Sequence, residues 1–183
     1  MSAHRLESKR LLLHPWESAD WIAFKPIATD PLVMKYILDG QIWPDDRIIA
    51  FVERQRRYYR DFGFCLWKLV SKDKNRLVGF CGLQPLNDLP GIEIGWWLAS
   101  DLWGQGLATE AAQLILNDGF GRLDLNRIVA VALWENRAST RIMEKLGMTY
   151  EEEVLHHGFR AVMYSIEKKS WRAVATDLSF PRS

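Results

Sequence analysis

The chain has 183 residues, of which 48% are hydrophobic and 26% are charged, and its formal net charge is +1. This length favours one domain over residues 1–183, with a core from 8 to 171 and a loose polar tail over 172–183. The balanced charge argues against a general nucleic-acid-binding surface, which needs a strong basic excess.

One strand and two helices are predicted in the first third of the chain. The apolar run RLLLHPW over 10–16 predicts a strand. Asp30 and Pro31 have the pattern of an N-cap followed by an N1 proline, so a short helix is expected through LVMKYIL. A longer amphipathic helix is expected from Asp45 to Gly63.

Three strands are predicted to follow closely. The runs FCLWKLV (64–70) and RLVGFCGL (76–83) are joined by the polar turn SKDKN, which suits a hairpin. After a loop that contains two prolines, IEIGWWL (92–98) predicts the third strand. Within it, Gly95 indicates a bulge, a close approach of another backbone, or a packing gap beside a tryptophan.

The C-terminal part alternates helices and strands. We expect a helix over 106–120, a buried strand over RIVAVAL (127–133), a helix that ends at Gly147, and a closing hairpin around 157–158. This order predicts an α/β domain with a mixed sheet. Ligand-binding loops are then expected at the carboxyl end of the 92–98 strand.

The two cysteines and the N-terminus indicate the compartment. Cys65 and Cys81 lie in apolar runs without CxxC spacing, so a buried, reduced pair is favoured over a disulfide or a nucleophile. No His, Cys or Asp cluster has metal-ligand spacing, so no metal is expected. The N-terminus MSAHRLESKR lacks a secretion signal, and no apolar run reaches the roughly 20 residues of a membrane span. We therefore expect a cytoplasmic protein without membrane contact.

Small residues gather where the 92–98 strand gives way to a helix, in LWGQGLATEAA (102–112). The first N–H groups of a helix lack partners within it and carry the positive end of its dipole, so they favour a phosphate. A dinucleotide fingerprint would need glycine in place of Thr109, and the GK[ST] of a nucleotide P-loop is absent. A tight turn that binds nothing is the other interpretation.

Two sequence blocks carry a resemblance to a known family. EIGWWLASDLWGQGLATEA, followed by ENRASTRIMEKLGM, resembles the GNAT superfamily of acyl-CoA-dependent N-acyltransferases, most of all its ribosomal-protein-alanine N-acetyltransferase branch. One departure from the superfamily pattern Q/R-x-x-G-x-G/A is Trp103 in its first position. The resemblance covers nearly the whole chain. It implies a mixed, mostly antiparallel sheet of six to seven strands flanked by helices, with a V-shaped splay between the parallel strands 92–98 and 127–133.

The resemblance also implies acetyl-CoA as co-substrate. The diphosphate bridge of coenzyme A would meet the backbone N–H groups of the glycine loop, and its pantetheine arm would lie in the V. A backbone N–H of Trp97 or Leu98 would stabilise the oxyanion of the thioester. Glu110 would repel a phosphate, so we expect it to point sideways. The residues implied in coenzyme binding are Trp97, Leu98, Trp103, Gly104, Gln105, Gly106, Leu107, Ala108, Thr109, Asn136 and Arg141.

Three residues are candidates for proton transfer. Ser139 matches a hydroxyl that the family often places beside the coenzyme sulfur, and it would protonate the leaving thiolate; helix capping is its other role. Glu93 and Glu153 compete as the base that receives the amine proton, and either one is otherwise a solvated surface carboxylate.

The predicted activity is acetyl transfer to a primary amine, either a protein N-terminus or a small molecule, by direct attack. Trp21 and Trp43 lie where relatives wall the acceptor cleft. A non-catalytic acyl-CoA-binding sensor or scaffold is the alternative function. The sequence does not decide between a monomer and a homodimer.

Overall fold

A computed structural model of the chain describes residues 5–173, so most of the predicted loose tail over 172–183 lies outside the described residues. The helices are α1 (Asp20–Ala28), α2 (Pro31–Met34), α3 (Asp45–Phe62), α4 (Leu107–Gly121) and α5 (Arg137–Lys145), with 3₁₀ turns at Ser100–Leu102 and Lys168–Ser170. The strands are β1 (Leu6–Glu7), β2 (Leu11–His14), β3 (Leu66–Ser71), β4 (Arg76–Pro85), β5 (Ile92–Leu98), β6 (Arg127–Leu133), β7 (Thr149–His156) and β8 (Phe159–Glu167).

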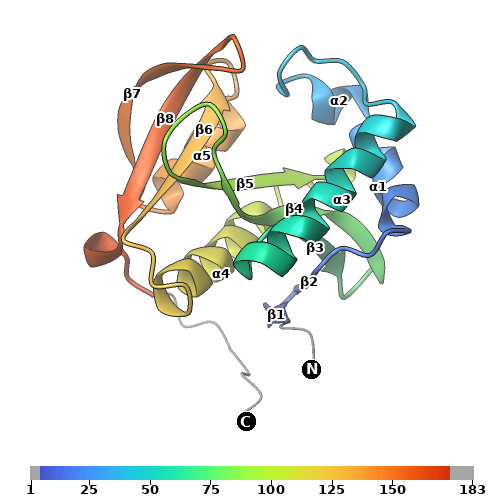
Figure 1. The fold of residues 1–183 in the computed structure, drawn as a ribbon, viewed down its shortest axis with the longest axis horizontal. Coiled ribbons are helices and arrows are strands. Elements are labelled where there is room, and N and C mark those ends of the chain that lie inside the picture. The colour runs from blue at the N-terminus through green and yellow to red at the C-terminus, as the bar shows by residue number, and fades with distance from the viewer. Residues whose placement is uncertain (1–4, 174–183) are drawn as a thin grey trace.

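All these strands form one mixed sheet in the order β1-β2-β3-β4-β5-β6-β8-β7 (Figure 1). Neighbouring strands are antiparallel except for β5 and β6, which are parallel. The mixed, mostly antiparallel sheet expected from the sequence is therefore confirmed. The sheet has eight strands rather than six or seven, because the two-residue strand β1 pairs with β2.

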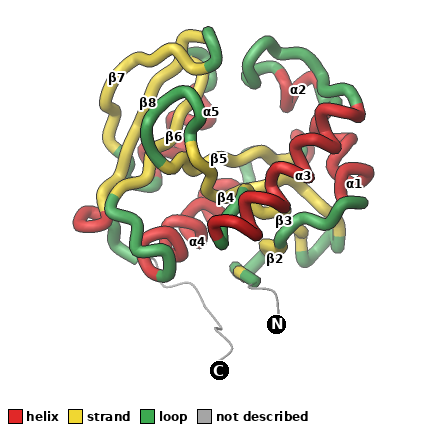
Figure 2. Tube along the Cα trace, viewed as in Figure 1, coloured by secondary structure: helices red, strands yellow, loops and turns green. Residues whose placement is uncertain are grey.

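The parallel strands β5 and β6 separate soon after they meet. Their pairing is limited, in the part of the chain that the structure describes, to Glu93 opposite Val129, close to the start of both strands. Beyond that pair the strands diverge toward their carboxyl ends (Figure 2). This is the V-shaped splay that the family resemblance implies. It leaves one edge of each strand without a strand partner.

Helices cover the two faces of the sheet. Phe80 of β4 and Trp97 of β5 are register partners on one face, where their rings pack against Phe24 of α1 at 5.9 and 6.1 Å between centroids. Leu83 of β4 points to the other face, where its Cδ1 lies beside Gly119 of α4. The helices α1 and α3 thus cover one face and α4 covers the opposite one.

Several predicted details are confirmed. The helix α3 ends at Gly63, which adopts the left-handed conformation with φ of 73°, and Gly147 after α5 has φ of 78°. Cys65 and Cys81 are buried and free, and this burial raises the pKa of both thiols. None of the helices formed by residues 5–173 combines the length and apolar character that crossing a membrane requires.

Other details differ from the sequence expectation. The helix α1 was not expected, because Pro26 interrupts its pattern and its buried residues cluster at one end. The helix α2 ends at Met34 instead of continuing through LVMKYIL, and the chain then turns through Leu38 and Gly40, both with positive φ. The β4–β5 ladder runs through Gly95 without a register shift, so this glycine marks no bulge there.

Gly82 gives a test of the close strand packing beside the V. An added Cβ would lie 2.0 Å from the backbone oxygen of Cys65, the residue just before β3, an atom that cannot move away alone. We expect Gly82→Ala to lower the free energy of unfolding by about 3 kcal/mol. Gly121→Ala is the matched control, because apart from its chain neighbours and its own helix backbone no atom of the described chain lies within 4 Å of the new Cβ. It should be neutral or stabilise α4 by up to about 1 kcal/mol. Urea denaturation of both variants measures the difference.

Candidate functional site

A loop with two left-handed glycines links β5 to α4. Gly104 has φ of 75° and Gly106, the N-cap residue of α4, has φ of 76°. Within the described chain no side chain caps this helix end, so its first N–H groups are available to an anion. Apart from its two chain neighbours, no residue of 5–173 would have an atom within 4 Å of a Cβ at Gly104, so the backbone conformation, and not crowding, requires glycine there.

The other loop residues surround this helix end. Trp103 and Gln105 are exposed, Leu107 and Ala108 are buried, and Thr109 is half-buried. The indole Nε1 of Trp103 donates to the carbonyl of Leu98 at 2.9 Å, which fixes the loop against the end of β5.

Arg10 holds the loop from the side. Its backbone N–H donates to Oε1 of Glu110 at 2.9 Å, and its Nε donates to Oε2 at 2.6 Å. Its Nη1 also donates to the carbonyl of Gln105 at 2.8 Å. Glu110 therefore points sideways to the start of β2, as expected. Sequence reasoning missed Arg10, because no local pattern connects it with a loop that follows so much later in the chain.

The backbone donors of β5 alternate between its two edges. The N–H of Ala99, just after the strand, donates to Val78 of β4 at 2.9 Å. By alternation the N–H of Trp97 also faces β4, whereas the N–H and carbonyl of Leu98 face the gap beside β6. The contact from Trp103 to the Leu98 carbonyl agrees with this direction. Of the two donors considered for the oxyanion, Leu98 is the one that faces the V.

Glu93 is a buried carboxyl group at the closed end of the V. It accepts a hydrogen bond from Nε2 of Gln84 at 3.1 Å, and Gln84 accepts one from Gln55 of α3 at 3.4 Å. The exposed fraction of Glu93 is 8%. Burial raises its pKa to about 7; the hydrogen bond from Gln84 opposes this shift, and the charge of Asp88 adds to it. Glu93 is therefore poised to exchange a proton near neutral pH.

The predicted acceptor wall lies on the same face of β5 as Glu93. Trp43 packs on Trp97 with 4.8 Å between ring centroids. The buried Nε1 of Trp43 has no hydrogen-bond partner among the described residues. Trp21 is half-buried against the hydrophobic core. The indole N–H of Trp43 is thus left without a described partner beside the side chain of Trp97.

The start of α5 lies beyond the end of β6, on the other arm of the V. Oδ1 of Asn136 accepts the N–H of Ser139 at 3.1 Å, so Asn136 is the N-cap of α5. Ser139 is half-buried, and Arg141 is exposed. Asn136 and Ser139 therefore belong to the arm that faces Leu98, while Glu93 lies where the two arms meet.

Glu153 lies apart from this group. It is on β7, an edge strand that β8 and β6 separate from β5. Its carboxylate pairs with the guanidinium of Arg160 at 2.8 Å, and the hydrogen bond from Arg160 lowers the pKa of Glu153. A carboxylate held in this way is a weak base, and the structure does not bring it together with Glu93.

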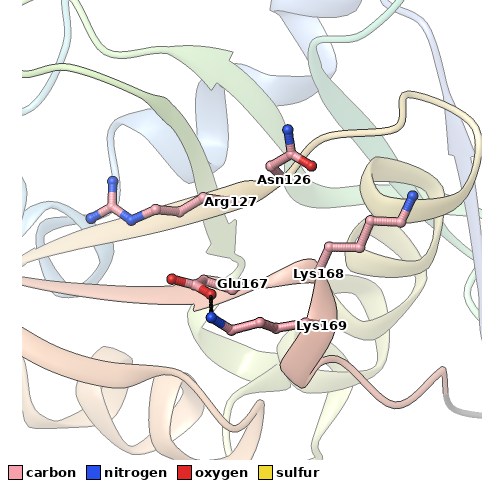
Figure 3. A pocket seen from close by; sticks show the side chains of 5 residues that line it. All are labelled: Asn126, Arg127, Glu167, Lys168 and Lys169. Carbon is pink, nitrogen blue, oxygen red and sulfur yellow. Dashed lines mark ion pairs between the residues drawn. The ribbon is translucent and has the colours of Figure 1, made fainter.

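A separate pocket lies at the start of β6, lined by Asn126, Arg127, Glu167, Lys168 and Lys169 (Figure 3). Since β5 and β6 are parallel, this end of the sheet is opposite to the glycine loop. Its cations have carboxylate partners: Arg127 pairs with Glu151 at 2.5 Å, Lys168 with Asp124, and Lys169 with Glu167 at 2.6 Å. These pairings make it a poor anion site.

Comparisons with known proteins agree with the geometry. A family model of the acetyltransferase (GNAT) domain matches residues 10–149. The uncharacterized N-acetyltransferase YnaD of Bacillus subtilis is 33% identical over 146 residues, which cover 80% of this chain and 83% of YnaD. A solved GNAT-family acetyltransferase from Bacillus anthracis is 30% identical with a TM-score of 0.76, covering 91% of this chain and 100% of that one. RimL, a ribosomal L7/L12 alpha-N-protein acetyltransferase solved with coenzyme A, shares the fold at 17% identity, with a TM-score of 0.73 over 90% of this chain and 98% of its own.

The burial of Glu93 predicts how stability depends on pH. Its pKa is raised from 4.5 to about 7 in the folded state, so its contribution to stability is complete below pH 4.5 and is lost as pH rises through about 7. The full loss corresponds to about 3 kcal/mol. Glu93→Gln keeps an acceptor for Gln84 and cannot ionise. We expect it to match the wild type at pH 4.5 and to be more stable by about 3 kcal/mol at pH 8.

Denaturation at both pH values measures this difference. Glu152→Gln, which changes an exposed carboxylate on β7, is the control and should show no comparable gain at pH 8. A Glu93 variant no more stable than the wild type at pH 8 would mean that the carboxyl group reaches water.

Proposed function

The chain belongs to the GNAT acetyltransferase family and is an N-acetyltransferase, and on that premise we propose that it transfers the acetyl group of acetyl-CoA directly to a primary amine. The acceptor is a peptide N-terminus or a small-molecule amine. The observation that carries the proposal is the gap between β5 and β6, which begins at Glu93 and opens beside the loop of Gly104 and Gly106.

The residues around this gap fit coenzyme A. The uncapped end of α4 offers backbone N–H groups and a positive dipole to the diphosphate. Arg10 holds the carbonyl of Gln105 and keeps Glu110 turned away, so the Glu110 carboxylate does not compete with the phosphates. The unpaired edge of β5 offers the N–H of Leu98 to the thioester oxygen, where negative charge develops during attack. Thr109, Asn136 and Arg141 are proposed to complete the binding surface.

Glu93 is the proposed base. It receives the proton of the attacking amine, directly or through one water molecule, and its pKa of about 7 keeps much of it ionised at neutral pH. The neutral amine nitrogen then attacks the thioester carbon, and the carbon–sulfur bond breaks. The nitrogen loses its second proton as the amide forms, and this proton replaces the one that Ser139 gives up. Ser139 is proposed to give a proton to the departing sulfur. Because a thiol has a pKa of about 8.5, this second proton matters less.

The pKa of the base bears on the acceptor. An α-amine has a pKa of about 8, so passing its proton to Glu93 costs about 1.4 kcal/mol, whereas a lysine side chain at about 10.4 costs nearly 5 kcal/mol. These values favour an acceptor whose amine has a low pKa. RimL, whose fold this chain shares, is a ribosomal L7/L12 alpha-N-protein acetyltransferase.

The two candidate bases predict opposite results on substitution. We expect Glu93→Gln to lower kcat by about 100-fold or more, the lower range of general-base contributions, without changing the Kd for acetyl-CoA. Glu153→Gln should change kcat less than twofold, because Arg160 already neutralises that carboxylate. Steady-state rates and direct binding of acetyl-CoA separate the two. A large loss in the Glu153 variant alone would transfer the role to β7.

The glycine loop predicts an effect on coenzyme affinity. An alanine is unfavourable at φ of 76°. In the Gly106→Ala variant the unbound loop is therefore expected to adopt another backbone conformation, and coenzyme binding must restore the original one. A cost of 1–2 kcal/mol weakens coenzyme A binding by about tenfold. Pantetheine lacks the diphosphate, so its weaker binding should be unaffected. Gly121→Ala is the control at the other end of α4. Equal losses for coenzyme A and pantetheine would contradict a diphosphate site at this loop.

The activity itself is tested by following thiol release from acetyl-CoA with the purified protein. The acceptor panel contains peptides with free and blocked N-termini, polyamines and aromatic amines. Release that depends on a free amine supports the proposal. If the protein binds coenzyme A but releases no thiol with any amine of the panel, the proposed transfer is refuted and the alternative of a non-catalytic binding module is supported.

A further inference from the structure

Two loops that are distant in sequence meet beside the V. The loop between β4 and β5 carries Asp88, and the tip of the β7–β8 hairpin carries His156 and His157; Figure 1 shows this green loop beside the orange hairpin. Oδ2 of Asp88 lies 3.1 Å from Nδ1 of His156 and 3.8 Å from Nδ1 of His157. One potential ligand atom from each residue lies within 4.8 Å of the other two. The proposed acetyl transfer uses none of these three side chains.

We propose that Asp88, His156 and His157 form a binding site for one divalent transition-metal ion, with Zn²⁺ the ion that the donors suit best. A tetrahedral ion with bonds of about 2.0–2.2 Å to imidazole and carboxylate holds its donor atoms about 3.4 Å apart. The observed separations of 3.1 and 3.8 Å bracket that value. Two imidazoles and one carboxylate form a ligand set for such ions, with a position left for water.

The site is largely arranged before an ion arrives. The backbone N–H of His157 donates to Oδ2 of Asp88 at 2.8 Å, which orients the carboxylate as outer-shell hydrogen bonds do in metal sites. The two imidazole rings lie 4.3 Å apart between centroids, and His157 has φ of 49° at the hairpin tip. Although it is buried, Nδ1 of His156 makes no well-directed hydrogen bond to any described residue. A metal ion between the rings would give it a partner.

The ion would join two parts of the sheet that are otherwise weakly connected. The loop of Asp88 leads into β5, and the hairpin belongs to the arm formed by β6, β8 and β7. In the described structure the single β5–β6 bridge pair joins these parts within the strand ladder, and the hydrogen bond from His157 to Asp88 joins them beside the V. A bound ion would reinforce this second connection across the V.

Zinc titration of the untagged, EDTA-treated protein tests the site. We expect competition with a chromophoric chelator to show one saturable Zn²⁺ per chain, and Tm to rise with Zn²⁺ because the ion binds the folded state. His156→Ala and Asp88→Asn should each weaken binding by more than the roughly 10–100-fold that loss of an outer-shell partner costs. His14→Asn removes an imidazole from β2 and should leave binding unchanged.

Each result decides the proposal. If the three side chains form only an ion pair, Zn²⁺ neither binds stoichiometrically nor raises Tm, and the proposal is wrong. The proposal is also wrong if Zn²⁺ binding survives in both His156→Ala and Asp88→Asn but is lost in His14→Asn. Matching Tm values of all variants in EDTA show that lost binding is not lost folding. Loss of Zn²⁺ binding does not bear on acetyl transfer, because the thiol-release assay runs in EDTA.

Discussion

The divergence of β5 and β6 is the constraint on which the site depends. Two parallel strands that stayed paired would use their backbone donors on each other and leave no space between them. Here the pairing is confined to Glu93 and Val129 in the described structure, so the edge of β5 beyond that point lacks a strand partner. Polar backbone groups need hydrogen bonds, and an extended ligand that carries amides can supply them. The chain continues from the end of β5 into the glycine loop, so in the proposed function one feature of the sheet positions both the reacting end and the phosphate end of coenzyme A.

An open V must be held by contacts outside the strand ladder. On one arm, Arg10 fixes the loop through Glu110 and the carbonyl of Gln105. On the other, Asn136 caps α5. Where the arms meet, a carboxyl group is buried with a glutamine as its hydrogen-bond partner, and its burial destabilises the ionised protein. A buried carboxyl that lowers stability at neutral pH is expected where function, and not packing, determines the residue.

Local patterns predicted much of the fold. The strands β5 and β6 have the predicted bounds because their apolar runs end at turn residues. Gly63 and Gly147 end their helices because the left-handed conformation at these positions favours glycine. The helix α1 escaped prediction because only its last residues are buried and Pro26 breaks its pattern. The strand β1 has two residues and depends on pairing with β2, which no local pattern shows.

The parts of the candidate site that lie within one continuous segment could be predicted from the sequence, whereas the parts that combine residues from distant segments could not. The glycine loop and the cap of α5 are continuous segments, so their motifs indicated them. Glu93 and Glu153 look alike in sequence, since each lies within a strand, and only the order of the sheet buries one and leaves the other beside Arg160. The contact between Asp88 and the hairpin histidines joins segments on opposite sides of the V. Spacing rules cannot detect such a cluster, because its members become neighbours only after β6 and β8 have paired and brought the hairpin to the loop.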